Sequence, residues 1–380
     1  MTPLILVSAS ATDTERLRKN GPRRDFVELA AALDADVLYS ERRSGHGGLW
    51  GKVVGPHVRQ AWAAASQAGP GQVIFADGEH NGLPLLLFLT LRGKRSQRVV
   101  MLGHYVSKRW KRALLWAGTR LIRQGAMAVH SVAQADAVRR VVADGWRLEL
   151  TPYQVDTQFW STDMAGTRAK SRPVFVAAGA ESRDYETLAA AAREVEADVV
   201  IAGASHWARS ETAAQSTPAN VTFLRDALGF AELRDLYARA RGVVVPLHDV
   251  PNQSGITTVL EGMSMGLPTI VSATRGQREA TRGPLIRGRG LIAEENLAGR
   301  GPHLLVSEAS PDAPPNGLYV PPGDVTALAR AMRLLIDEPE LAARMGAQGR
   351  ADVVRSFDTC HFVERLREIV GQPGRAGRKT

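Results

Sequence analysis

The stretch Gln253–Pro268 reads QSGITTVLEGMSMGLP, and its pattern decides the fold. Its apolar residues recur at i, i+3, i+4 and i+7, which predicts a helix with one face on a core. Ser254 is a favoured N-cap residue, and Gly255 allows a ligand to approach the backbone closely. The closing Gly-Leu-Pro ends the helix before a second apolar run. The stretch therefore predicts a loop, a short helix and a buried strand, in that order.

The same helix carries polar groups that suit a nucleotide. Gln253, Thr257 and Glu261 are spaced four apart and share a second face. The first N–H groups of a helix have no intrahelical partner and carry the positive end of its dipole, so they attract phosphate. Glu261 lies further along and can accept hydrogen bonds from paired sugar hydroxyls. The pattern suits the diphosphate and ribose of a nucleotide, and the plainer alternative is a capped helix with one solvated glutamate.

The length and composition of the chain limit the class of protein. A chain of 380 residues with 44% hydrophobic content predicts two globular domains. Its one cysteine, Cys360, excludes a disulfide framework and a cysteine-based metal site. The chain enters an apolar strand with no charged leader, and the apolar run Leu83–Leu91 is too short to span a bilayer. We expect a cytoplasmic protein whose only membrane contact is peripheral, at the inner face.

The positive charge is concentrated in the first half of the chain. The net charge is +9, and no acidic residue lies between Glu79 and Asp136. That interval contains a predicted helix, Ser107–Gln124, which is basic, amphipathic and carries tryptophans, a pattern typical of adsorption to an anionic membrane. A solvated helix packed on its own sheet is the alternative, and nucleic acid is not expected because no recognition motif accompanies the charge. The cations proposed for membrane contact are Lys108, Arg109, Lys111 and Arg112.

Short apolar runs alternate with helical stretches along the whole chain. This alternation predicts an α/β protein with two Rossmann-like, doubly wound domains that face a central cleft. The predicted strands are 4–8, 36–39, 72–76, 99–102, 126–130, one near Leu148, 174–178, 199–202, 221–224, 243–246 and 269–272. The predicted helices are 25–33, 55–67, 83–91, 107–124, 133–143, 185–196, 231–240, 254–265, 325–337 and 339–354. The Gly-, Arg- and Pro-rich segment 281–315 predicts a long loop.

Four motifs follow one another through the second half of the chain. They are Val155–Trp160 (VDTQFW), Glu261–Val271 (EGMSMGLPTIV), Arg275–Glu279 (RGQRE) and Asn316–Asp324 (NGLYVPPGD). Their order and content resemble the retaining glycosyltransferases of family 4, also described as glycosyl transferases group 1, which have the GT-B fold. The likeness covers Val155 to Phe357 strongly, and the first half is consistent with it.

The resemblance implies an enzyme that transfers a sugar from a nucleotide-diphosphate donor to an acceptor, with retention at the anomeric carbon. The leaving phosphate then helps to deprotonate the acceptor, and the protein stabilises the charge that grows on the diphosphate. No metal site and no cofactor besides the donor substrate are expected. Synthesis of a cell-envelope glycan or glycolipid is the setting that accounts best for the basic helix.

The GT-B resemblance also implies that the two domains bind different substrates. We expect an acceptor-side N-terminal domain, an interdomain linker, a donor-binding C-terminal domain, a C-terminal helix that crosses back to the N-terminal domain, and a disordered basic tail. Their expected limits are 1–155, 156–172, 173–356, 357–370 and 371–380.

Two positions depart from the family pattern. Gln253 stands eight residues before Glu261, where the family usually has a glutamate, so it can bind the donor sugar but carries no charge. Ala180 stands where an arginine is usual, and the diphosphate role passes to Arg183, for which a solvated surface charge is the alternative. The donor site implied by the resemblance is Arg183, Gln253, Ser254, Gly255, Ile256, Thr257 and Glu261, and the catalytic residues are Gln253, Glu261 and His104.

The first half of the chain contributes two candidates at predicted strand ends. His104 follows the strand 99–102, where the family often places a histidine over the donor sugar, although a plain structural role is the alternative. A polar cluster follows the strand 72–76 and suits a polyhydroxylated acceptor or a general base, or else a turn that caps the next helix. Its residues are Asp77, Glu79, His80 and Asn81.

Two rival functions stay open. A nucleotide-sugar 2-epimerase has the same fold, but it needs a catalytic carboxylate and a histidine pair over the sugar, and the carboxy-terminal motifs favour the transferase. A nucleotide-sugar-binding protein without catalysis belongs to another class, and the substitutions at Gln253 and Ala180 are what favour it.

Overall fold

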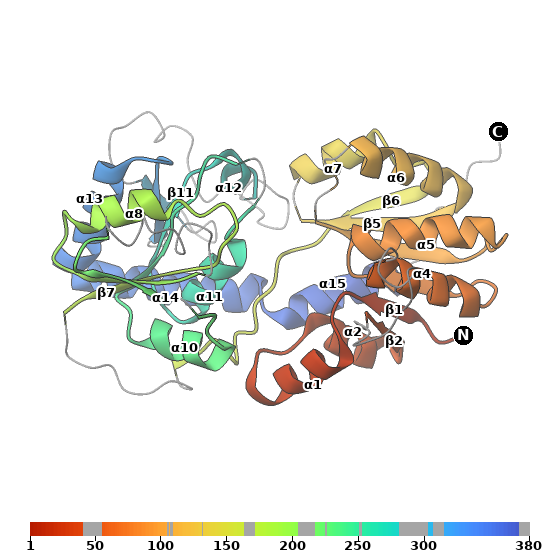
Figure 1. Ribbon diagram of the computed structural model, residues 1–380, viewed down its shortest axis with the longest axis horizontal. Helices are drawn as coiled ribbons and strands as arrows, with labels where there is room; N and C mark the ends of the chain where they lie inside the picture. The colour runs from red at the N-terminus through yellow and green to blue at the C-terminus, as the bar shows by residue number, and fades with distance from the viewer. Residues whose placement is uncertain are drawn as a thin grey trace. The chain divides into compact units, whose positions relative to one another are not determined.

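The computed structural model describes residues 1–40, 55–104, 106, 109–130, 132–162, 172–203, 217–224, 226–250, 253–280, 303–306 and 315–371. The chain forms two compact units (Figure 1), and each is described by itself. Unit 1 comprises Met1–Lys19, Arg23–Pro152 and Cys360–Thr380, and unit 2 comprises Asn20–Pro22 and Tyr153–Thr359.

Unit 1 is built on a six-stranded parallel sheet with the order β2-β1-β3-β4-β5-β6. Side chains alternate across each strand, so Leu4 and Leu6 of β1 pack on one face while Ile5 and Val7 pack on the other. The strands are β1 Leu4–Val7, β2 Asp36–Tyr39, β3 Val73–Ala76, β4 Arg98–Gly103, β5 Gln124–Val129 and β6 Trp146–Leu150.

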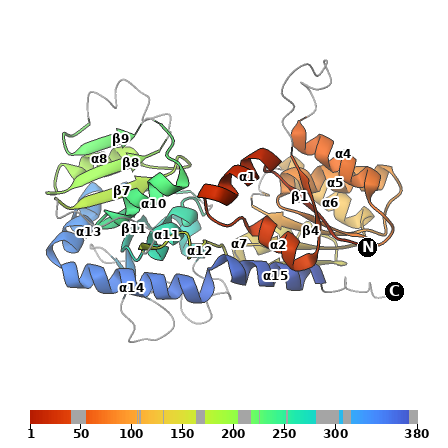
Figure 2. The same cartoon turned by 90° about the horizontal axis from the view of Figure 1, so that it is seen from below.

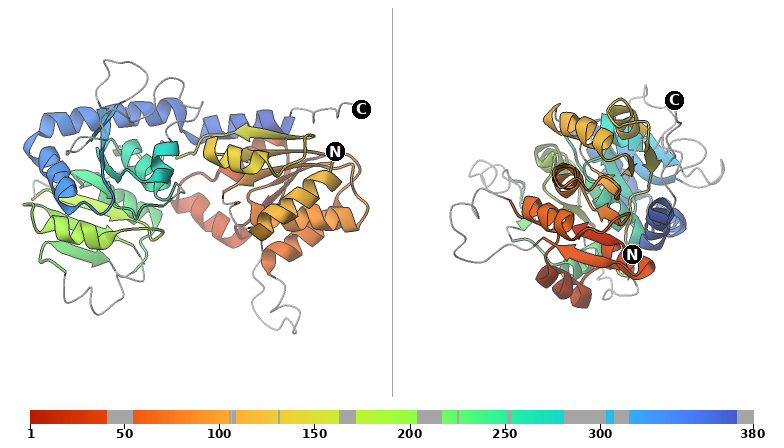
Figure 3. Two further views of the ribbon diagram at one scale, coloured as in Figure 1. Left: turned by 90° about the horizontal axis from the view of Figure 1, so that it is seen from above. Right: turned by 90° about the vertical axis from the view of Figure 1, so that its right-hand side faces the viewer.

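Helices cover both faces of this sheet. One face packs against α4 (Pro56–Gln67), α5 (Glu79–Leu91), α6 (Arg109–Leu121) and α7 (Val132–Arg139), which lie together in Figure 1. The other face packs against α2 (Asp25–Leu33) and α15 (Thr359–Gly371), which lie close to each other in Figures 2 and 3. The last helix of the chain therefore completes the unit that its first strand begins.

Unit 2 is built on a seven-stranded sheet with the order β12-β13-β11-β10-β7-β8-β9. Its strands are parallel except for β12, which pairs with β13 in the antiparallel direction at the edge. The strands are β7 Val174–Ala178, β8 Asp198–Ala202, β9 Val221–Leu224, β10 Gly242–Val245, β11 Thr269–Ser272, β12 His303–Val306 and β13 Pro315–Val320.

The helices of unit 2 also divide between two faces. α8 (Tyr185–Ala192) and α13 (Val325–Asp337) pack side by side on one face (Figure 1). α10 (Phe230–Ala238) and α11 (Ile256–Ser264) pack on the other. The long helix α14 (Pro339–Ser356) contacts α11, and α12 (Arg275–Ala280) follows β11.

The prediction of two doubly wound α/β domains is confirmed. The predicted strands and helices are present, and most of their ends lie within a few residues of the predicted ones. The predicted cleft between the domains and the limits 1–155, 156–172, 173–356 and 357–370 stay predictions.

Four of the described elements were not predicted, and one of them is the strand β13, because Asn316–Asp324 was identified only as a motif. The helix α1 (Ala11–Asn20) has only one buried residue, Thr14, so it has no apolar stripe that periodicity could detect. α12 is only six residues long. The prediction of a loop over 281–315 was wrong at β12, because pairing with β13 makes His303–Val306 a strand despite its surroundings. The predicted tail 371–380 was wrong at Gly371, which ends α15. Residues 281–302, 307–314 and 372–380 lie outside the described residues.

Candidate functional site

The candidate donor site of unit 2 begins at the N-terminus of α11. The helix starts at Ile256, and its N-cap residue is Gly255 with φ +85°, so the predicted N-cap Ser254 was wrong by one residue. A side chain at Gly255 would be strained in this left-handed conformation. Its Cβ would also lie 2.6 Å from Cγ1 of Val245 and 3.2 Å from Nη1 of Arg183. Glycine is therefore required for the loop to pass beside Arg183.

Gln253 precedes this N-cap and is buried, with 8% of its surface exposed. Neither the amide nitrogen nor the amide oxygen of its side chain has a hydrogen-bond partner among the described residues. Its backbone carbonyl accepts a hydrogen bond from the N–H of Ile256 at 3.3 Å, so that predicted phosphate donor is already engaged. A buried unpaired amide costs about 1–3 kcal/mol, which a polar ligand can offset. The side chain is thus free to bind a group that offers both a donor and an acceptor.

Arg183 is held at the end of β7 by three hydrogen bonds. Its Nε donates to the carbonyl of Ala178 at 2.9 Å, its Nη1 to the carbonyl of Glu181 at 2.8 Å, and its Nη2 to Oγ1 of Thr258 at 3.1 Å. Burial lowers the pKa of Arg183, but an arginine stays protonated in proteins. The guanidinium is therefore a fixed positive charge that is hydrogen-bonded to the first turn of α11. These contacts and its burial argue against the alternative of a solvated surface charge.

A second glycine lies against the same guanidinium. Gly179 has φ +95°, and a Cβ there would come within 2.5 Å of Nη2 of Arg183. Gly179 and Gly255 thus flank the arginine from two segments that are far apart in the sequence. The close approach of two backbones to one cation is the arrangement expected where an anion is to be bound.

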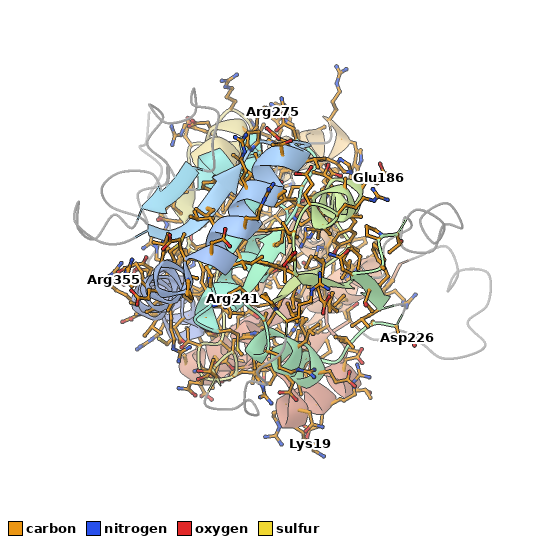
Figure 4. The ribbon with its side chains drawn as sticks, turned by 90° about the vertical axis from the view of Figure 1, so that its left-hand side faces the viewer. Lys19, Glu186, Asp226, Arg241, Arg275 and Arg355 are labelled. Atoms are coloured by element: carbon orange, nitrogen blue, oxygen red, sulfur yellow. The ribbon has the colours of Figure 1, made fainter. Side chains whose placement is uncertain are left out.

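The loop between β10 and α11 is fixed by polar contacts. Oγ of Ser254 lies 3.3 Å from Oγ of Ser182, and the carbonyl of Ser254 accepts a hydrogen bond from Nε2 of Gln277 at 2.7 Å. Arg275, labelled in Figure 4, forms an ion pair with Asp249 at 3.2 Å. The segment that presents Gln253 is therefore positioned by α12 and by the turn after β7.

Glu261 lies half-buried on α11, where Oε2 accepts a hydrogen bond from the hydroxyl of Tyr237 at 3.3 Å. Burial raises the pKa of Glu261 to about 8, although the Tyr237 hydroxyl and the charge of Arg183 both act to lower it. The carboxyl is thus largely protonated at neutral pH in the free protein. Hydroxyl groups that donate to it would favour the ionised form. Thr257, the other residue of this predicted face, is exposed.

The first-half candidates lie in unit 1, at the ends of β1, β3 and β4. Asp77 accepts hydrogen bonds at Oδ2 from the N–H and the hydroxyl of Ser8, at 2.6 and 2.8 Å, and at Oδ1 from Nδ2 of Asn81 at 2.8 Å. The ring of His80 lies 4.5 Å from that of His57, and its Nε2 is 3.8 Å from Oδ1 of Asp77. Asp77 and Asn81 therefore join two strand ends through their side chains.

Glu79 is buried and fully engaged. Its Oε1 pairs with Nζ of Lys111 at 2.8 Å, and its Oε2 accepts from the N–H of His104 at 3.1 Å. Burial raises the pKa of Glu79, but these hydrogen bonds outweigh it and the pKa is lowered. Glu79 is thus an anion that already has its partners, and it begins α5, four residues before the predicted helix start at Leu83.

His104 is exposed after β4. Its Nε2 lies 3.0 Å from the carbonyl oxygen of Asp77, and its own carbonyl accepts from Nε2 of Gln134 at 3.0 Å. The neighbouring His130, whose ring centroid is 5.5 Å away, is buried, and this burial lowers its pKa to about 3. His130 is therefore neutral, and His104 is the histidine that solvent and substrate can reach.

The structure adds residues that the sequence did not single out. Thr258, Tyr237 and Gly179 contact the predicted Arg183 and Glu261. Only their places in the fold bring them there, although the glycine that follows β7 is a signal for a turn near a ligand. Among the described residues, no three histidine, cysteine or acidic side chains are grouped to hold a metal ion.

A part of unit 2 that contains the candidate donor site is similar in sequence to a known family. Residues 172–338 match the family described as glycosyl transferases group 1. No curated protein matches the sequence of this chain.

The matched residues lie within a fold that solved structures share over nearly the whole chain. Sucrose-phosphate synthase from Thermosynechococcus elongatus has a TM-score of 0.66 at 18% identity, covering 97% of this chain and 98% of that one. The α,α-trehalose-phosphate synthase (UDP-forming) from Burkholderia vietnamiensis has a TM-score of 0.64 at 11% identity, with 97% of each chain covered. HepE of Anabaena, solved with UDP and glucose, has a TM-score of 0.60 at 13% identity, with 98% and 100% covered. These likenesses establish the GT-B fold.

Proposed function

We propose that the chain is a glycosyltransferase that moves a sugar from a nucleotide-diphosphate donor to an acceptor with retention of anomeric configuration. The observation that carries the proposal is the buried, unpaired amide of Gln253 beside the glycine N-cap of α11, whose backbone borders the guanidinium of Arg183. The match of residues 172–338 to the family described as glycosyl transferases group 1 supports it. So do the structural neighbours, which include sucrose-phosphate synthase and HepE in complex with UDP-glucose.

Each part of the donor has a matching group in unit 2. The N-terminus of α11 and Arg183 would hold the diphosphate, since both present positive charge to one place. Glu261 would accept hydrogen bonds from the ribose hydroxyls. Gln253 would bind the hydroxyls of the transferred sugar through its two free amide atoms. Ser254, Gly255 and Thr257 would shape the loop and the first turn around the phosphates.

The chemistry assigned to the protein is electrostatic. The bond between the anomeric carbon and the diphosphate breaks, and negative charge grows on the leaving oxygen. Arg183 and the helix N-terminus would stabilise that charge, and removing one such donor costs about 3 kcal/mol of barrier. In the mechanism that the resemblance implies, the acceptor oxygen attacks from the face that the phosphate leaves, and the phosphate takes its proton. The proposal needs no metal ion and no cofactor besides the donor.

The residues of unit 1 would serve the acceptor. His104 is exposed at the end of β4 and would contact the sugar or the acceptor. Asp77, Glu79 and Asn81 would act by shaping this edge of the sheet, because their side chains are already hydrogen-bonded. His80 would contact the acceptor directly. A glycan or glycolipid intermediate of the cell envelope is the acceptor class proposed here, with the enzyme cytoplasmic and peripheral at the inner membrane face.

One specific observation favours a second candidate, a donor-binding protein without catalysis. Gln253 and Ala180 replace the glutamate and arginine that the resemblance leads one to expect, so two charges are missing from the site. Incubation with a labelled donor separates the two functions, because only the enzyme releases nucleoside diphosphate. The anomeric configuration of the product, measured by NMR, then tests retention.

Thermal unfolding in the presence of UDP, GDP, ADP, TDP and their sugars tests the donor site. A ligand at about 100 times its dissociation constant stabilises the folded state by about 2.7 kcal/mol. We expect one base to shift the melting temperature of the wild type and the Glu261→Ala variant to lose that shift. The control is Glu186→Ala, because Glu186 is exposed on α8 (Figure 4) and should leave the shift unchanged. If no nucleotide shifts the wild type, the proposed donor site is wrong.

A further inference from the structure

Unit 1 exposes an unusual number of large apolar side chains on one layer of helices. The described residues include nine exposed large hydrophobic side chains, and seven of them lie on α4, α5 and α6. Trp62, Trp110 and Trp116 are 48%, 57% and 52% exposed. We call this surface the α4–α6 face. Besides the three tryptophans, it carries Leu87, Leu91, Leu114 and Leu121.

These side chains are not the ones that hold the helices on the sheet. Leu86 and Leu115 make the core contacts of α5 and α6, and both are buried. A Cβ at Gly118 would lie 2.9 Å from Leu86, so the two helices pack closely together. Trp110, Leu114 and Leu121 follow at i, i+4 and i+11, which makes a second apolar stripe that points away from the core. An exposed apolar stripe of this kind indicates a surface that binds something outside unit 1.

The exposed charged side chains of these three helices and of Arg92, which follows α5, have one sign. Arg92 stacks on Trp62 at 4.6 Å and Arg120 on Trp116 at 4.4 Å, while Arg109 and Arg112 are exposed on α6. Between Pro56 and Leu121 the chain has only two acidic residues. These are Asp77 and Glu79, and both are held by hydrogen bonds at the strand ends. The α4–α6 face therefore presents tryptophan, leucine and arginine with no free carboxylate.

This surface differs from the basic cluster that the sequence predicts. Lys111 is only 16% exposed and its ammonium group pairs with Glu79, so it is not available to a partner. Lys108 lies outside the described residues. Of the four predicted cations, Arg109 and Arg112 are therefore the two that are exposed on α6. Further apolar and cationic side chains come from α4 and α5, which the sequence did not connect with α6.

We propose that the α4–α6 face docks on an anionic lipid surface. Tryptophan and leucine would enter the interface between headgroups and acyl chains, and the arginines would pair with lipid phosphates. None of the described helices is long and apolar enough to cross a membrane, so the contact would be peripheral. Exposed leucines beside the tryptophans favour lipid over nucleic acid, because bases need stacking rather than aliphatic insertion. The inference does not depend on the proposed transferase activity.

Flotation with vesicles tests the docking. The probes are vesicles of phosphatidylcholine alone and of phosphatidylcholine with phosphatidylglycerol. We expect binding to the anionic vesicles only, weakened by salt. Each arginine near such a surface contributes roughly fivefold in affinity, so Arg109→Gln with Arg112→Gln should bind about 25-fold more weakly. Trp110→Ser with Leu114→Ser should also weaken binding, and this loss should persist at high salt.

The matched control removes two arginines elsewhere in unit 1. Arg139 and Arg140 are exposed at the end of α7, off the α4–α6 face, so Arg139→Gln with Arg140→Gln should leave binding unchanged. Each variant is first checked for an unchanged melting temperature. Equal binding to neutral and anionic vesicles, equal losses in both arginine pairs, or no vesicle binding by the wild type would each overturn the proposal. Binding of an RNA or DNA oligonucleotide in place of vesicles would also overturn it.

Discussion

At the scale of single residues, the buried amide of Gln253 lowers the stability of the free protein and is available to bind a ligand. Its amide is buried without a partner among the described residues, so the free protein bears the cost of desolvating it. We predict that Gln253→Met, which has a similar shape and no amide, stabilises the free protein by about 1 kcal/mol. The same variant should lose the extra stabilisation that a nucleotide sugar gives over the nucleotide alone. Denaturant unfolding with and without ligand measures both effects.

Gln277 provides the matched control for that substitution. It is equally buried, but its Nε2 donates to the carbonyl of Ser254 at 2.7 Å. Gln277→Met should therefore destabilise the free protein, because it removes a buried hydrogen bond. If both variants lose stability to the same extent, the amide of Gln253 has a partner in the free protein and its role as a free ligand-binding group fails.

At the scale of elements, the hydrophobic periodicity of the sequence predicted the helices and strands that pack on a core, and it missed elements that have little buried surface of their own. The spacing of Gln253–Met265 is enough to place the helix that carries the site. The polar helix α1 and the edge strand β12 give no such signal, because the first has almost no buried face and the second depends on pairing with β13. Because they belong to this helix or to the loop before it, the positions of Gln253, Gly255 and Glu261 could be predicted from the sequence. The contact between Tyr237 and Glu261 could not, because it depends on how α10 packs in the fold.

The packing of α11 against α14 makes a prediction at this scale. A Cβ at Gly346 of α14 would overlap the carbonyl of Gly266, just after α11, and neither backbone can move aside easily. Gly346→Ala should therefore destabilise unit 2 by roughly 1–3 kcal/mol despite the better helix propensity of alanine. Gly349→Ala is the control in the same helix, since its Cβ would meet only the flexible side chain of Met263 at 3.3 Å. Equal melting temperatures for the two variants would contradict this account.

At the scale of the whole molecule, the raised pKa of Glu261 links stability to pH and, if the proposed donor site holds, links donor binding to pH as well. Burial raises the pKa of Glu261 in the folded state to about 8 from the ordinary value of 4.5, so the unfolded chain releases this proton first as pH rises. Stability should then fall with increasing pH up to about 8, by roughly 1.4 kcal/mol per pH unit at the steepest point. His130 adds nothing above about pH 7.5, because burial keeps it neutral in the folded state and the unfolded histidine, with a pKa of 6.5, has lost its proton by then.

Donor binding should show the opposite dependence in the same pH window. Ribose hydroxyls would donate to the ionised carboxylate, so binding would remove the proton from Glu261 and become stronger as the pH rises toward about 8. Calorimetry in buffers of different ionisation enthalpy should detect the released proton. Glu261→Gln cannot ionise, so it should bind the donor weakly at every pH and release no proton. Proton release that persists in this variant would assign the titration to another group and separate Glu261 from the nucleotide.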